Sequence, residues 1–98
     1  MLTGKQRAQL RGIANSLQPV VMIGKQGLTP EVTASADEVL EARELIKVSL
    51  LENAMIDIKD AAETLSGRTR SEIVSVVGRK FVLYRKSKTK DIIELKKK

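Results

Sequence analysis

The chain has 98 residues, enough for one domain, and a net charge of +6, but it contains neither His nor Cys. Disulfides, thiolate metal sites and the usual nucleophile–base pairs of enzymes are therefore excluded, and we expect no catalytic site, metal or cofactor. Residues 1–36 and 61–98 carry net charges of +3 and +7, whereas residues 37–60 carry −4, so we expect a bipolar surface.

The first predicted element is a helix that begins after Thr3, which forms a capping box with Gln6. Arg7 and Arg11 are four residues apart and share one flank of this helix, either as solvated side chains or as phosphate ligands. Pro19 is expected to end the helix. An apolar stripe follows helical spacing: Leu10, Ile13, Ala14 and Leu17.

A glycine-containing loop over residues 24–30 is the strongest functional signal. Residues 20–23 before it are continuously apolar, as expected of a strand buried on both faces. Gly24 and Gly27 allow a tight turn and the close approach of another molecule. Thr29 suits the N-cap of a helix over 30–43, whose exposed amides beside a lysine would suit a phosphate. The alternative is a purely structural turn between strand and helix.

The helix over 30–43 and the strand after it complete a βαβ unit, which we expect to be right-handed and parallel. In the strand over 45–51, Lys47 and Ser49 lie opposite the apolar residues, so that face is predicted to be partly open. The helix is expected to turn an acidic face to solvent: Asp37, Glu38 and Glu41. Its predicted core face is formed by Val32, Ala36, Val39 and Leu40.

The remaining elements predict a single α/β domain of order α-β-α-β-α-β-β, with a four-stranded mixed sheet packed with helices. A third helix is expected from about 57 to 66, stopped by Gly67. Strands over 72–77 and 81–85 flank a basic hairpin tip that includes Arg79 and Lys80. The strand order does not follow from the sequence, nor whether residues 92–95 form an edge strand or pack on the domain.

Tyr84 and the pair Asp57 and Asp60 could be functional residues, but each also has a purely structural explanation. Tyr84 could stack on a base, but a lone tyrosine in a strand more often packs against its neighbours. Asp57 and Asp60 are explained by helix capping and solvation more simply than by a metal site. No apolar run is long enough for a membrane span, and the first helix lacks the Trp and Phe of membrane-surface helices, so we expect a cytoplasmic protein without membrane contact.

Five segments together resemble the CRM domain, and most closely its stand-alone bacterial form, the YhbY type. They are TGKQR (3–7), LQPVV (17–21), IGKQGLT (23–29), ELIKV (44–48) and VGRKFVLYR (77–85). The resemblance spans residues 1–86 as one RNA-binding domain, which leaves 87–98 as a basic C-terminal extension that we expect to be partly ordered. Asn15 and Ser49 depart from the family pattern, since His and a basic residue are common there.

The resemblance implies a fold similar to the C-terminal domain of bacterial translation initiation factor three, and RNA binding through the glycine loop and the neighbouring basic surface. We expect a non-enzymatic protein, and a small basic domain of this kind can act as a monomer. Bacterial members are associated with precursors of the large ribosomal subunit, which suggests a role in ribosome assembly through contacts with ribosomal RNA. The main alternative is a protein-interaction module that uses the acidic second helix or the C-terminal tail. The predicted RNA-binding residues are Gly24, Lys25, Gln26, Gly27, Thr29, Lys5, Arg7, Arg11, Lys47, Arg79, Lys80 and Arg85.

Overall fold

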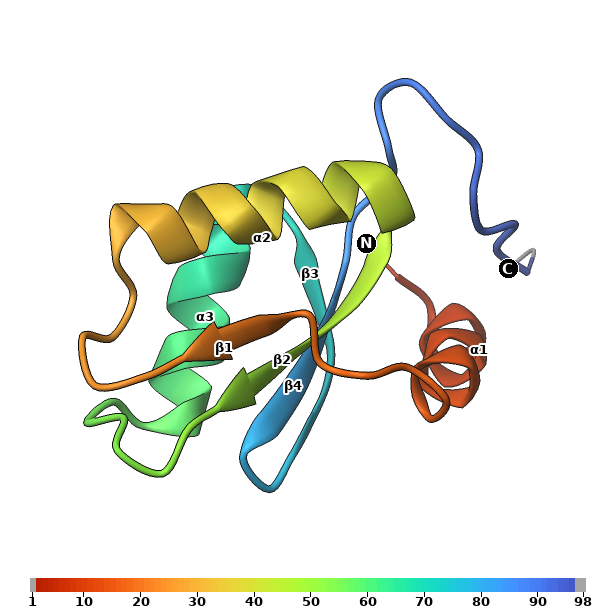
Figure 1. The fold of residues 1–98 in the computed structure, drawn as a ribbon. Coiled ribbons are helices and arrows are strands. Elements are labelled where there is room, and N and C mark those ends of the chain that lie inside the picture. Colours follow the sequence, from red (N-terminus) through yellow and green to blue (C-terminus); the bar gives the residue numbers. More distant parts are fainter. Residues whose placement is uncertain (1, 97–98) are drawn as a thin grey trace.

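A four-stranded sheet divides the molecule, with one helix on one side and two helices on the other (Figure 1). The computed structural model describes residues 2–96. The elements follow the predicted order: α1 (Gly4–Ala14), β1 (Val21–Ile23), α2 (Pro30–Arg43), β2 (Leu45–Leu50), α3 (Ile58–Thr69), β3 (Glu72–Val77) and β4 (Lys80–Tyr84). The single α/β domain with a mixed sheet is confirmed.

The strands lie in the order β1-β2-β4-β3. β1 and β2 are parallel, as predicted for the βαβ unit, whereas β4 pairs antiparallel with both β2 and β3. The last strand of the chain therefore lies inside the sheet, between β2 and β3. This order places the hairpin tip of β3 and β4 beside the carboxyl end of β2.

The side of the sheet that faces α2 and α3 holds the main core. Alternate strand residues point to this side, among them Ile46 and Val48 of β2 and Phe81 and Leu83 of β4. The predicted apolar faces of both helices pack on them, including Ala36, Leu40, Ala61, Ala62 and Leu65. The binary pattern of the sequence thus identified this core correctly.

The opposite side is covered only at one end, by α1. Leu10 and Ala14 of α1 pack on Leu45 and Tyr84, and Tyr84 is only 6% exposed. Packing against neighbours, not base stacking, is therefore what the structure assigns to this tyrosine. The rest of this side of the sheet lies beyond α1 and is open.

Two boundaries and one burial prediction were wrong. β1 is an edge strand whose Met22 is 49% exposed, because α1 does not reach over it, so the strand is not buried on both faces. α1 ends at Ala14, well before Pro19. α3 continues through Gly67 to Thr69, and Arg70 ends it in the left-handed conformation (φ 56°) that a glycine was expected to supply.

The predicted acidic face of α2 is exposed at Asp37 and Glu38, but the C-terminal segment is bound to its third residue, Glu41. Glu41 accepts a hydrogen bond from the Ser87 hydroxyl at 2.6 Å and others from the backbone amides of Lys88 and Thr89. These bonds, that from Ser87 foremost, lower the pKa of Glu41 to about 2. Asp37 is likewise engaged, by an ion pair with Arg85.

The C-terminal segment has neither helix nor strand over 87–96 and runs from α2 to the side of α1 (Figure 1). Buried Glu44 accepts hydrogen bonds from the amides of Ser87 and Ile93 at 2.8 and 2.7 Å. Ile93 and Leu95 pack on the α1 cluster, so this apolar patch packs on the domain and adds no strand. Residues 97 and 98 of the predicted extension lie outside the described residues.

Candidate nucleic-acid interface

The loop between β1 and α2 has the geometry expected of a tight, open turn. Gly27 adopts a positive φ of 74°, and its amide donates to the carbonyl of Gly24 at 3.0 Å. The Thr29 hydroxyl accepts from the amide of Val32 at 3.2 Å, so this side chain serves as the N-cap of α2. Lys25 and Gln26 project from the turn as exposed side chains.

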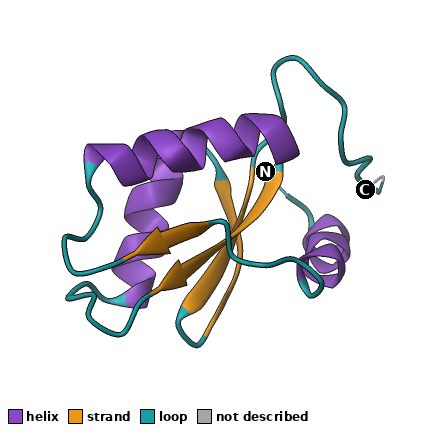
Figure 2. Ribbon diagram, in the orientation of Figure 1, coloured by secondary structure: helices purple, strands orange, loops and turns teal. Residues whose placement is uncertain are grey.

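Three loops are joined at the same end of the sheet. The Gly24–Gly27 turn and the loop after β2 leave the sheet together (Figure 2), and the amide of Leu51 donates to the carbonyl of Ile23 at 2.9 Å. The hairpin tip joins them because the amide of Leu50 donates to the carbonyl of Arg79 at 2.7 Å. These two hydrogen bonds hold the start of the glycine loop to the loop after β2 and to the hairpin tip.

Beside the loop lies the uncovered part of the sheet, which we call the open face. The strand registers arrange its side chains in two rows across the strands. The first row is Met22, Ser49, Lys80 and Val77, and the second is Lys47, Val82 and Ser75. The open face thus combines two lysines with apolar and hydroxyl groups and carries no acidic side chain.

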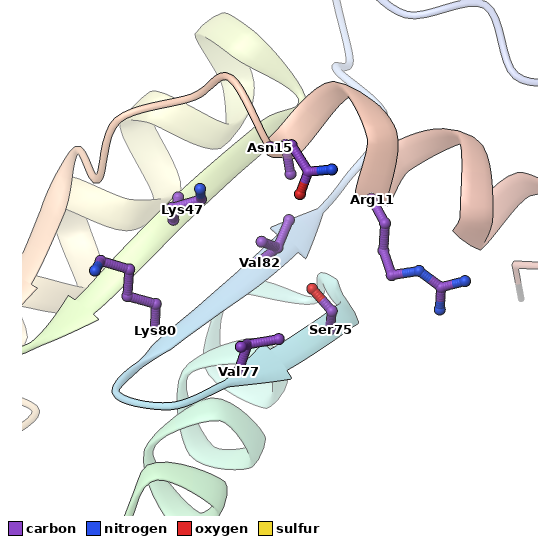
Figure 3. Close-up of a pocket in the computed structure, with 8 residues that line it drawn as sticks. Arg11, Asn15, Lys47, Ser75, Val77, Lys80 and Val82 are labelled. Carbon is purple, nitrogen blue, oxygen red and sulfur yellow. The ribbon is translucent and has the colours of Figure 1, made fainter.

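The C-terminal half of α1 forms the border of the open face. Arg11 and Asn15 project from it next to Lys47 and Ser75 (Figure 3). Within residues 2–96, the cations in salt bridges are Arg85 and Lys86 alone, so the charges of Arg11, Lys25, Lys47 and Lys80 are not neutralised by carboxylates. Such side chains are available to a polyanion.

The structure thus brings most of the predicted RNA-binding residues onto one continuous surface of the loop, the open face and α1. They are Gly24, Lys25, Gln26, Gly27, Thr29, Arg11, Lys47 and Lys80. Lys5 is exposed on α1, six residues before Arg11 and therefore about 9 Å farther along the helix.

Three predicted arginines are instead engaged inside the protein. Arg7 donates to the carbonyl of Ile73, and Arg79 donates to the carbonyls of Leu50 and Leu51. Arg85 lies on the side of α2, where it contacts Asp37 and the carbonyl of Thr69. Their guanidinium groups hold strands, loops and helix ends together, which a count of positive charges in the sequence cannot reveal.

The sequence did not identify the uncharged part of the open face. The alternation of residues in β1 and β4 would have placed Met22 and Val82 there. Ser75 could not be placed, because β3 contains a bulge: Ile73 pairs with Leu83, but Ser75 pairs with Val82. The bulge brings Ser75 opposite Val82 and thus onto the open face.

None of the helices in residues 2–96 is both long and apolar enough to cross a membrane.

Comparisons with known proteins give one family model and several relatives that are named as RNA-binding proteins. Residues 2–85 match the model of the CRS1 / YhbY (CRM) domain. The probable RNA-binding protein YqeI of Bacillus subtilis is 46% identical over 97% of this chain and 99% of its own length. The probable RNA-binding protein PA4753 of Pseudomonas aeruginosa is 34% identical over 88% of this chain and 83% of its own.

A solved structure shows the same fold. It is the solution structure of the Staphylococcus aureus protein SAV1595, to which RNA binding has been ascribed. The match has a TM-score of 0.81 and 49% sequence identity, and it covers 98% of this chain and all of the other. The fold and the sequence thus point to the same relatives.

Proposed function

Because this chain belongs to the CRS1 / YhbY (CRM) domain family, we propose that it binds RNA and acts as a binding protein without catalysis of its own. The RNA backbone would lie along the Gly24–Gly27 loop and continue over the open face. Loop amides, Lys25 and the N-terminus of α2 would contact phosphates at one end, and Lys47, Lys80 and Arg11 would contact them along the sheet.

The observation that carries this proposal is the continuity of the surface. The glycine turn, the four un-neutralised cations (Arg11, Lys25, Lys47 and Lys80) and the end of α1 adjoin, and the two rows of the open face contain no carboxylate. Asp37 and Glu41 of α2 lie on the other side of the sheet, where Arg85 and the C-terminal segment engage them. This arrangement favours an RNA ligand over the alternative of a protein partner bound to the acidic helix.

The identity of the bound RNA is a separate question from RNA binding itself. The resemblance to stand-alone bacterial CRM proteins leads us to propose ribosomal RNA in precursors of the large subunit, with a role in subunit assembly. A cell extract separated on a sucrose gradient tests this proposal. The protein should sediment with large-subunit precursors, and Lys25→Ala should shift it toward the top of the gradient.

Direct binding to RNA fragments tests whether the loop and the open face bind RNA. Wild type, Lys25→Ala and Lys47→Ala are compared at several salt concentrations, with Lys59→Ala as a control of equal charge on the exposed surface of α3. For single-stranded RNA, each lost phosphate contact should reduce the slope of log K against log salt by about 0.7. Equal slopes for all four proteins would contradict phosphate binding at the loop and the open face.

A further inference from the structure

A pocket of about 290 Å³ lies between the C-terminal half of α1 and the open face. Its floor is apolar and consists of buried Val82, with Ala14 at the side of the helix and the exposed Val77 at the rim. The volume is close to the lower end of the range for small-ligand pockets, roughly 300–1,000 Å³. The pocket can therefore hold one small planar group.

Cations stand on both sides of this floor (Figure 3). Lys47 and Lys80 lie on the side of β2 and β4, and Arg11 lies on the side of α1. A ligand with a planar apolar group between two phosphates could place that group on the floor of the pocket. One phosphate would then lie near Lys47 and Lys80 and the other near Arg11. This is the charge pattern of a nucleotide within a single strand.

Two uncharged polar side chains lie at the pocket between those cations. Asn15 lies at the end of α1 and Ser75 stands on β3 (Figure 3). An amide supplies both hydrogen-bond donors and an acceptor, and a hydroxyl supplies one of each, which suits the edge of a nucleobase. Binding of a phosphate requires neither the Asn15 amide nor the Ser75 hydroxyl. The pocket therefore has groups that can bind a base in addition to the cations that can bind the RNA backbone.

We propose that this pocket takes one unstacked nucleotide of the bound RNA, with the base on Val77 and Val82 and its edge at Asn15 and Ser75. The inference rests on the proposed function, since it names the part of the RNA that one portion of the same surface accepts. Asn15 is the specificity-determining residue at this position. In this proposal the Gly24–Gly27 loop binds the RNA backbone, and the pocket recognises one base.

Affinity for RNA is therefore compared with affinity for inorganic polyphosphate, a polyanion without bases. Asn15→Ala and Val77→Ser keep the charge of the pocket and change only its contacts with a base. We expect each to weaken binding of a single-stranded RNA oligomer by about three- to tenfold and to leave polyphosphate binding unchanged. Ile92→Ser, an exposed apolar residue on the C-terminal segment, is the matched control.

Nuclear magnetic resonance of the intact chain gives an independent readout, and it also verifies that each variant is folded. RNA should shift the side-chain amide of Asn15 and the backbone amides of Ser75 and Val77, whereas polyphosphate should shift the amides of the glycine loop, Lys47 and Lys80 and leave the side-chain amide of Asn15 unchanged. If RNA shifts the loop but not the signals of Asn15, Ser75 and Val77, and both variants bind RNA like wild type, the pocket is refuted and the proposed function stands. If wild type binds no RNA, both are refuted.

Discussion

The guanidinium of Arg85 donates a hydrogen bond to the carboxylate of Asp37 at 2.5 Å and links the end of β4 to α2. It also donates to the carbonyl of Thr69, at the end of α3, at 2.9 Å. The sequence suggested Arg85 as an RNA ligand and Asp37 as part of an exposed acidic face. Because the two charges neutralise each other, Arg85 is not free to bind RNA, and the carboxylate of Asp37 is exposed but already paired.

Arg85→Ala is therefore expected to affect stability more than RNA affinity. The side chain is only 13% exposed, and its removal leaves the Thr69 carbonyl and the Asp37 carboxylate without this donor. We expect a loss of about 1–3 kcal/mol in the free energy of unfolding, measured by urea denaturation. RNA binding by the folded fraction should stay within about twofold of wild type, and a larger loss would place Arg85 in the interface.

The attachment of the C-terminal segment is expected to depend on pH. The pKa of Glu41 lies at about 2 in the folded protein because the Ser87 hydroxyl and neighbouring amides bond its carboxylate, against an ordinary value of 4.5. Since the folded pKa is the lower one, the stability that Glu41 contributes is complete above pH 4.5 and is lost as the pH falls toward 2. The amide signals of Lys88 and Thr89 should report the release.

Glu44 adds to the same dependence. Burial raises its pKa, but the amides of Ser87 and Ile93 together with Lys86 outweigh this effect, so the pKa lies below its ordinary value. Glu41→Gln should flatten the stability profile in the acid range, whereas Glu38→Gln, at an exposed position of the same helix, should leave it like wild type. Equal profiles for both variants would contradict the attachment by Glu41.

The sequence predicted the elements well because local signals are strong in this chain. The capping box of Thr3 and Gln6 forms as predicted, and α2 has the expected boundaries with Thr29 as its N-cap. The period-2 pattern of β2 likewise predicted that Lys47 would face an open surface. In each case a few neighbouring residues determine the structure.

The features that the sequence did not predict depend on distant partners. The carbonyls that bind Arg7 and Arg79 belong to other strands, and they decide which arginines remain available. The bulge that places Ser75 on the open face depends on the pairing of β3 with β4. A pattern within one strand or helix contains no information on these contacts.

Two glycines with different backbones should respond oppositely to alanine. Gly67 lies within α3, and no atom lies within 4 Å of an added Cβ, so Gly67→Ala should raise the free energy of unfolding by about 0.5–1 kcal/mol. Gly78 has equally open space but a φ of 61°, so Gly78→Ala should lower it by about 1–2 kcal/mol. Urea denaturation of both variants measures the difference, and a stabilising Gly78→Ala would contradict the turn geometry.

Gly24→Ala tests whether the loop needs a small side chain at this position, because alanine adds a methyl group there without backbone strain. An added Cβ would lie 3.5 Å from Leu51 Cδ1, an ordinary contact, so we expect the free energy of unfolding to change by less than about 0.5 kcal/mol. RNA affinity should fall about tenfold, because the methyl group obstructs the approach of the backbone. Gly67→Ala, on the far side of the sheet, is the control and should bind like wild type. If Gly24→Ala also binds like wild type, RNA does not approach the loop closely at this position.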